Sequence, residues 1–154
     1  MSLEASGSEA GPLLVIGVGH RYRRDDGVGP YVAAALAVRG LEALLHEGDG
    51  LGLLDLWQGR ERCLVVDAIA GPAAAGEIRR MASDVAALRA AGFVHSSHRI
   101  GLPEAVALGQ AFERMPRRLE VIGIVGRDFG FGEGLSPEVA RAADRLIADL
   151  DEIR

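Results

Sequence analysis

Apolar runs and amphipathic stretches alternate along the chain, and this alternation predicts an α/β fold. Short, nearly continuous apolar runs are typical of strands that helices cover on both faces. They predict strands at residues 13–18, 41–46, 61–66 and 119–125, and an alternation of apolar and polar residues predicts an edge strand at 76–82. Helical spacing predicts helices at residues 29–38, 51–58, 85–91, 102–114 and 135–153. We therefore expect one three-layer domain, with a mostly parallel, twisted sheet of about five strands and helices on both faces.

Polar residues that favour helix starts precede several of the predicted helices. Ser83 or Asp84 is positioned to cap the helix that follows them, and Ser136 to cap the last helix, with Pro137 in its first position. Asp25 or Asp26 can accept hydrogen bonds from the free amides at the start of the first helix. One cap needs only one carboxylate, so the second aspartate requires another explanation.

Acidic residues follow three of the predicted strands. Asp25 and Asp26 follow the first strand, Glu47 and Asp49 the second, and Asp67 the third. In parallel α/β sheets, ligands bind beyond the carboxyl ends of the strands, most often where the strand order reverses. We therefore expect these carboxylates to share one rim of the sheet. Asp67 is the sharpest candidate, because its apolar neighbours make a buried charge costly unless the carboxylate is paired or binds a cation.

Two histidines, His95 and His98, lie in the predicted loop before the helix at 102–114. From the residues alone, each is either an ordinary loop histidine or a partner of the carboxylates. Two carboxylates and one imidazole that converge from separate loops would form a site with open coordination positions, suited to a divalent metal such as zinc or nickel. Spacing along the chain does not decide whether these residues converge.

Composition and charge exclude several other classes of function. The net charge of −5 gives no attraction to nucleic acid or to an anionic membrane. Every basic side chain other than histidine is an arginine, which excludes a catalytic lysine. Cys63 is the only cysteine in the sequence, and its apolar neighbours predict a buried small hydrophobe rather than a nucleophile. The GxSxG and HExxH motifs of familiar serine and zinc hydrolases do not occur in the sequence.

Residues 1–11 are polar and rich in glycine and serine, and we expect them to form a flexible N-terminal segment before a single domain at 12–154. This segment lacks the basic and apolar regions of a secretory signal. No apolar run reaches the roughly 18 uncharged residues of a membrane span. We expect a cytoplasmic protein that does not enter a membrane.

The glycine turn at residues 17–19 also suggests a nucleotide site, because dinucleotide-binding folds begin with a similar strand, turn and helix. Here the third glycine position is Tyr22, and the carboxylates of Asp25 and Asp26 would repel a phosphate group. A nucleotide-binding, doubly wound regulatory domain therefore stays an alternative with weak support.

Several ordered blocks of the sequence resemble the nickel-iron hydrogenase maturation endopeptidases. The blocks are GVGHRYRRDDGVG, GDGLGLLDL, VVDAI, SSHRIGLPEAV and LSPEV, and the similarity runs from residue 13 to residue 153. Members of this family trim the C-terminal extension of the hydrogenase large subunit once nickel has been inserted. The resemblance implies an endopeptidase of the same fold, with the large-subunit precursor as its partner.

The resemblance also assigns roles to individual residues. The metal contacts of the family fall on Asp26, Asp67 and His98, since the Gly-Leu after the histidine sets the register on His98 rather than on His95. The metal is the nickel already held by the substrate, so these side chains would complete its coordination and act on nickel-loaded precursor alone. We expect zinc or cadmium to substitute for nickel in vitro. Asp26 is expected to be catalytic, with Asp25 as a proton acceptor.

The chain departs from the family pattern beside these positions. His20 stands where the family usually has asparagine, which makes it a candidate for an extra ligand. The basic residues Arg21, Arg23 and Arg24 either form a solvated loop or meet an acidic substrate surface. A second alternative follows from these changes: a non-catalytic protein of the same fold that binds the precursor as a nickel-dependent chaperone.

Overall fold

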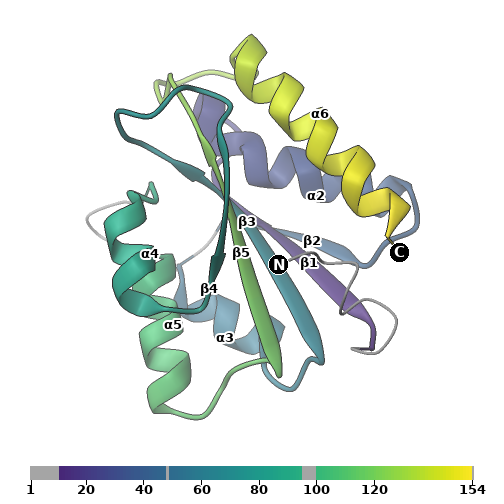
Figure 1. The fold of residues 1–154 in the computed structure, drawn as a ribbon, viewed down its shortest axis with the longest axis vertical. Helices are drawn as coiled ribbons and strands as arrows, with labels where there is room; N and C mark the ends of the chain where they lie inside the picture. The colour runs from purple at the N-terminus through teal and green to yellow at the C-terminus, as the bar shows by residue number, and fades with distance from the viewer. Residues whose placement is uncertain (1–10, 48, 95–99, 154) are drawn as a thin grey trace.

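The computed structural model describes residues 11–47, 49–94 and 100–153, which form one sheet between two layers of helices (Figure 1). The five strands of this described part are β1 (Leu13–Val18), β2 (Ala43–His46), β3 (Arg62–Ile69), β4 (Ile78–Ala82) and β5 (Arg118–Val125). Their order in the sheet is β2-β1-β3-β5-β4, with β4 antiparallel to β5 and all other pairs parallel. The predicted fold class is confirmed, including the edge strand within residues 76–82.

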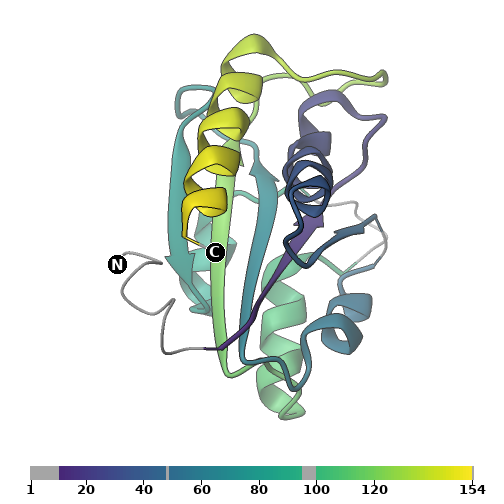
Figure 2. The same ribbon diagram turned by 90° about the vertical axis from the view of Figure 1, so that its right-hand side faces the viewer.

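Helices cover both faces of the sheet. Helices α2 (Val28–Val38) and α6 (Pro137–Glu152) pack against each other on one face, as the side view in Figure 2 shows. The other face is covered by α3 (Leu51–Trp57), α4 (Val85–Ala91) and α5 (Leu102–Ala111). A short 3₁₀ helix, η1 (Arg24–Gly27), precedes α2. None of the described helices combines the length and apolar character needed to cross a membrane, and the cytoplasmic location stays a prediction.

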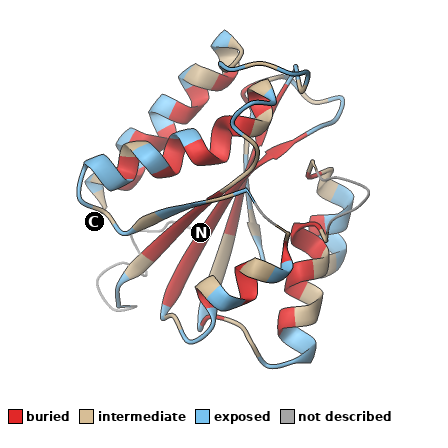
Figure 3. Ribbon diagram, turned by 180° about the vertical axis from the view of Figure 1, so that it is seen from behind, coloured by how far each residue is buried: buried red, intermediate tan, exposed pale blue. Residues whose placement is uncertain are grey.

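The sheet has a separate core on each face, because side chains alternate along its strands. All eight residues of β3, the central strand, are buried, as expected for a parallel strand covered on both sides. Leu64 and Val66 belong to the core under α2 and α6, whereas Cys63 and Val65 belong to the core under α3, α4 and α5. Figure 3 shows the buried positions along the sheet and on the inner sides of the helices. Cys63 is therefore a buried small hydrophobe, as predicted.

Several predicted boundaries differ from the structure, two of them by three residues. The strand predicted to end before Asp67 continues to Ile69 as β3, because Asp67 and the next two residues pair in register with β5. Asp67 therefore lies inside a strand and not after its end. The helix predicted at 102–114 ends as α5 at Ala111, and Glu113 beyond it has a φ of 55°, which a right-handed helix does not accommodate.

One of the three predicted helix caps is confirmed. Asp84 accepts hydrogen bonds from the amides of Ala86 (3.0 Å) and Ala87 (3.4 Å) at the start of α4. Ser136 occupies the N-cap position of α6 and Pro137 is its first residue, as predicted, but the Ser136 side chain makes no capping hydrogen bond. The side-chain cap predicted for α2 is wrong, because that helix has none. The carboxylate of Asp25 and the hydroxyl of Ser136 are instead hydrogen-bonded to each other.

Candidate functional site

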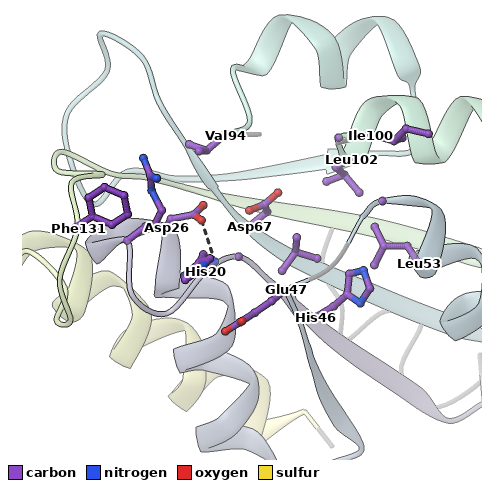
Figure 4. A pocket seen from close by; sticks show the side chains of 15 residues that line it. His20, Asp26, His46, Glu47, Leu53, Asp67, Val94, Ile100, Leu102 and Phe131 are labelled. Atoms are coloured by element: carbon purple, nitrogen blue, oxygen red, sulfur yellow. Dashed lines mark hydrogen bonds between the residues drawn. The ribbon is translucent and has the colours of Figure 1, made fainter. Parts of the chain in front are cut away.

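A cavity of about 450 Å³ opens at the carboxyl ends of β1, β2 and β3 (Figure 4). It lies where the strand order reverses: from β1 the chain goes outward to β2 and then crosses to β3 on the other side of β1. Ligands of doubly wound sheets bind at such points. The polar and aromatic residues that line the cavity are His20, Arg23, Asp26, His46, Glu47, Asp67 and Phe131.

Two glycines let the segment after β1 lie directly on the sheet. Gly19 has a φ of 143°, and a Cβ at this position would collide with the carbonyl oxygen of Asp26. A Cβ at Gly29, in the first turn of α2, would collide with carbonyl oxygens of β1 and β3. A side chain at either position would push η1 and α2 away from the strands. The glycines thus allow Asp26, on η1, to lie close to Asp67 in β3.

Asp26 points into the cavity from η1 (Figure 4). Its Oδ2 accepts a hydrogen bond from the amide of His20 at 2.9 Å, which orients the carboxylate. Burial raises the pKa of Asp26 above its ordinary value, although the hydrogen bond from His20 and the positive charge of Arg23 oppose this shift. The negative charge of Glu47 adds to the increase. Asp26 therefore binds a proton more readily than an exposed aspartate.

Asp67 lies at the floor of the cavity and is only 2% exposed. Its Oδ1 accepts a hydrogen bond from the amide of Ala68 at 2.8 Å. Burial raises the pKa of Asp67 well above its ordinary range, and the negative charge of Asp26 raises it further. Within the described residues, no ion pair includes Asp67. The carboxylates of Asp26 and Asp67 thus share one cavity, and the buried carboxylate of Asp67 forms no ion pair among the described residues. A cation would stabilise this arrangement.

The third predicted metal contact, His98, lies outside the described residues, as does His95. Val94 and Ile100, the described residues on either side of positions 95–99, both line the cavity. Among the residues that the structure describes, no three histidine, cysteine, aspartate or glutamate side chains form a metal-binding group. The structure thus brings the two predicted aspartates together, and the histidine stays a prediction.

The two acidic residues predicted at this rim after the second strand have different positions. Glu47 lines the cavity and forms an ion pair with Arg21 at 3.3 Å. Asp49 does not line the cavity; its Oδ1 accepts hydrogen bonds from the amides of Leu51 (3.1 Å) and Ile100 (3.3 Å). Asp49 therefore holds the start of α3 against the segment that leads into α5.

Asp25 is adjacent to Asp26 in the sequence, but its carboxylate has different surroundings. It is fully buried, and its Oδ2 accepts hydrogen bonds from the amides of Arg127 (2.8 Å) and Asp128 (2.9 Å) and from the Ser136 hydroxyl (2.7 Å). Its Oδ1 accepts a fourth from the Ser136 amide at 2.7 Å. Burial by itself would raise the pKa of Asp25, but these hydrogen bonds outweigh burial and lower it. Asp25 does not line the cavity, so its position gives no support to the predicted role as proton acceptor.

Two histidines on the cavity wall have ring nitrogens already engaged. Nδ1 of His20 accepts a hydrogen bond from the Tyr22 amide at 3.1 Å, so the neutral ring carries its proton on Nε2 and has no free lone pair for a metal. Nε2 of His46 donates to the Asp49 carbonyl at 2.9 Å, which leaves the lone pair on Nδ1. The sequence analysis missed His46 as a cavity residue. Its place at the end of a predicted strand, directly before Glu47, is the signal that would have found it.

A family model identifies the protein family to which this chain belongs. Residues 48–152 match the sequence model of HycI, described as hydrogenase maturation protease. The chain belongs to the hydrogenase maturation protease family. It is therefore a peptidase of hydrogenase maturation, as the resemblance implied, and the nucleotide-binding alternative is not supported. A comparison with curated proteins found no match.

Solved structures of hydrogenase maturation proteases share the fold. NiFe hydrogenase maturation protease HybD from Thermococcus kodakarensis is 24% identical, with a TM-score of 0.72 over 93% of this chain and 99% of that chain. The maturating endopeptidase HybD from E. coli is 24% identical, with a TM-score of 0.69 over 92% and 93% of the two chains. HycI from Thermococcus kodakarensis KOD1 is 24% identical, with a TM-score of 0.71 over 98% and 97%.

Proposed function

We propose that this hydrogenase maturation protease removes the C-terminal extension of the large-subunit precursor of a nickel-iron hydrogenase after nickel insertion. In this proposal Asp26, Asp67 and His98 bind the nickel that the precursor carries, and this contact positions the peptide bond that is cut. The main support is the pair of aspartates in one cavity, with Asp67 buried and in no ion pair of the described residues. The assignment of His98 rests on the sequence resemblance.

The chemistry of these side chains fits a divalent cation. Burial raises the pKa of both aspartates, and the charge of Asp26 disfavours ionisation of Asp67, so a cation between them would stabilise both ionised forms. Carboxylate oxygens and an imidazole nitrogen are suitable ligands for divalent first-row metals, including nickel. Because the nickel arrives with the precursor, the contact also serves as a checkpoint: a precursor without nickel offers no anchor. We expect zinc or cadmium to occupy the same ligands in vitro.

Hydrolysis of the peptide bond requires a water molecule to attack the carbonyl carbon and a group that accepts its proton. Asp26 suits the second role, because its carboxylate faces the cavity. The proton then passes to the leaving amine as the C–N bond breaks. The nickel of the substrate would polarise the carbonyl group. Asp25, which already accepts four hydrogen bonds, has a structural role in this proposal.

A cleavage assay tests this proposal. Purified protein is incubated with nickel-loaded and nickel-free precursor, and the released extension is measured by mass spectrometry. We expect cleavage of the nickel-loaded form alone. Asp26→Asn should abolish cleavage without unfolding the domain, because the asparagine oxygen can still accept from the His20 amide. Asp55→Asn, at an exposed position outside the cavity, is the matched control.

Two outcomes would contradict the proposal. Equal cleavage of both precursor forms would exclude the nickel checkpoint. An Asp26→Asn variant that cleaves as fast as the Asp55→Asn control would exclude a role for Asp26 in the reaction.

A further inference from the structure

An aromatic ring and a guanidinium group lie together at the mouth of the cavity. Phe131, in the loop between β5 and α6, lines the cavity although it is 82% exposed. The guanidinium carbon of Arg23, which also lines the cavity, is 4.7 Å from the centre of the Phe131 ring, within the range of a cation–π pair. In Figure 4 the ring lies on the same side of the cavity as Asp26. The pair is therefore next to the proposed reaction site.

Backbone hydrogen bonds hold this pair in place. The Arg24 amide donates to the Gly132 carbonyl at 3.0 Å, and the Gly132 amide donates to the Tyr22 carbonyl at 2.9 Å. The Asp25 amide donates to the Asp128 carbonyl at 2.9 Å in the same loop. The residues before and after Arg23 are thus tied to the residue after Phe131. The exposed ring of Phe131 thus lies on a loop that these hydrogen bonds fix to the segment that carries Arg23.

Arg23 differs from its two basic neighbours. Arg21 forms an ion pair with Glu47 at 3.3 Å, and Arg24 forms one with Asp128 at 3.6 Å. Within the described part of the chain, no ion pair includes Arg23. Its planar guanidinium group can therefore donate two parallel hydrogen bonds to a carboxylate that arrives at the mouth.

We propose that Arg23 and Phe131 dock the precursor segment next to the nickel site, with a carboxylate of that segment on Arg23 and an apolar side chain on Phe131. This inference rests on the proposed function. The charges of the site favour this occupant, because the interior carries Asp26 and Asp67, which attract a cation, whereas the mouth carries a guanidinium group, which attracts an acid. Aromatic residues and arginine are also enriched in protein–protein interfaces.

Steady-state cleavage of nickel-loaded precursor by full-length variants tests this docking pair. Phe131→Ala should raise KM between about fivefold and thirtyfold and leave kcat within about twofold, because the ring contributes to binding and not to the reaction. Arg23→Gln should raise KM similarly, and its effect should shrink at high salt. Phe131→Tyr, which keeps the ring, should restore the wild-type KM. Phe112→Ala, at a 65% exposed phenylalanine that does not line the cavity, and Arg141→Gln, on the exposed side of α6, are the matched controls.

The outcomes separate this inference from the proposed function. A KM for Phe131→Ala equal to that of Phe112→Ala would overturn the docking role of the ring, and a loss confined to kcat would overturn it as well. A double variant whose KM increase is smaller than the product of the two single increases would support a shared contact. A wild-type protein that fails to cleave nickel-loaded precursor would contradict the proposed function instead.

Discussion

Removal of the Asp25 carboxylate is expected to destabilise the fold more than any other single aspartate truncation discussed above. Asp25→Ala takes away one fully buried acceptor and leaves four donors without it: the amides of Arg127, Asp128 and Ser136, and the Ser136 hydroxyl. All four hydrogen bonds are between 2.7 and 2.9 Å long, which is typical of bonds to a charged acceptor. The variant therefore loses the hydrogen bonds through which the Asp25 side chain connects η1 to the loop before α6.

The size of the effect follows from these contacts. A hydrogen bond to a charged group contributes roughly 1.5–3 kcal/mol, but the four share one acceptor and are not additive. Water reaches some of the donors once the carboxylate is removed, which lowers the loss further. We expect the free energy of unfolding to fall by about 4 kcal/mol, a large part of the 5–15 kcal/mol that is typical of a domain.

Urea unfolding of wild type and Asp25→Ala, followed by circular dichroism, measures this loss. The exposed Asp55, paired only with Arg114 among the described residues, is the control, and Asp55→Ala should change stability by less than about 1 kcal/mol. Because the folded-state pKa of Asp25 is lowered, its contribution is complete above the ordinary aspartate pKa and is lost as pH falls through the lower folded value. The difference between wild type and Asp25→Ala should therefore be constant from about pH 8 to pH 5 and shrink below about pH 4. A loss no larger than that of Asp55→Ala would refute the reasoning.

Two further predictions concern buried groups. Asp67→Asn should be more stable than wild type at pH 8. The raised folded-state pKa of Asp67 means that stability is lost as pH rises from the unfolded value through the folded one, and the asparagine oxygen still accepts from the Ala68 amide. An unchanged or lower urea midpoint would contradict this prediction. Burial raises the pKa of the Cys63 thiol to about 12, so the folded protein should not react with a thiol reagent at pH 8. The urea-unfolded protein should react. Labelling of the native protein within minutes would contradict this prediction and show that the core around β3 opens.

The elements of the fold could be predicted from the sequence because most of them are encoded locally. Apolar runs predicted four of the five strands of the described part, and alternation of apolar and polar residues predicted β4. Asp84 helped to predict the start of α4 through a cap that involves neighbours two and three residues away. The errors occurred where contacts between residues far apart in the sequence determine the structure. The last residues of β3 are strand because β5 pairs with them, and a residue such as Asp67 at the end of an apolar run does not reveal that pairing.

The roles of the two adjacent aspartates illustrate the same limit. A pair of aspartates before a helix predicts a cap, but Asp25 is bonded to a loop more than 100 residues further along the chain, which local pattern does not indicate. Asp26 and Asp67 could be predicted at one rim, because strand ends of a parallel sheet converge. Phe131 could not, since only the backbone contacts between two loops bring it to the mouth of the cavity.

The pKa shifts of Asp25 and Asp26 have opposite effects on the stability of the folded protein. Burial raises the pKa of Asp26 and Asp67, so their ionised forms destabilise the folded protein at neutral pH. Hydrogen bonds lower the pKa of Asp25, so its ionised form stabilises the same turn of chain. Asp67→Asn should therefore restore part of the stability that Asp25→Ala loses. Asp26 and Asp67 interact electrostatically, whereas Asp25 and Asp67 have no contact in common among the described hydrogen bonds, so the two changes should add.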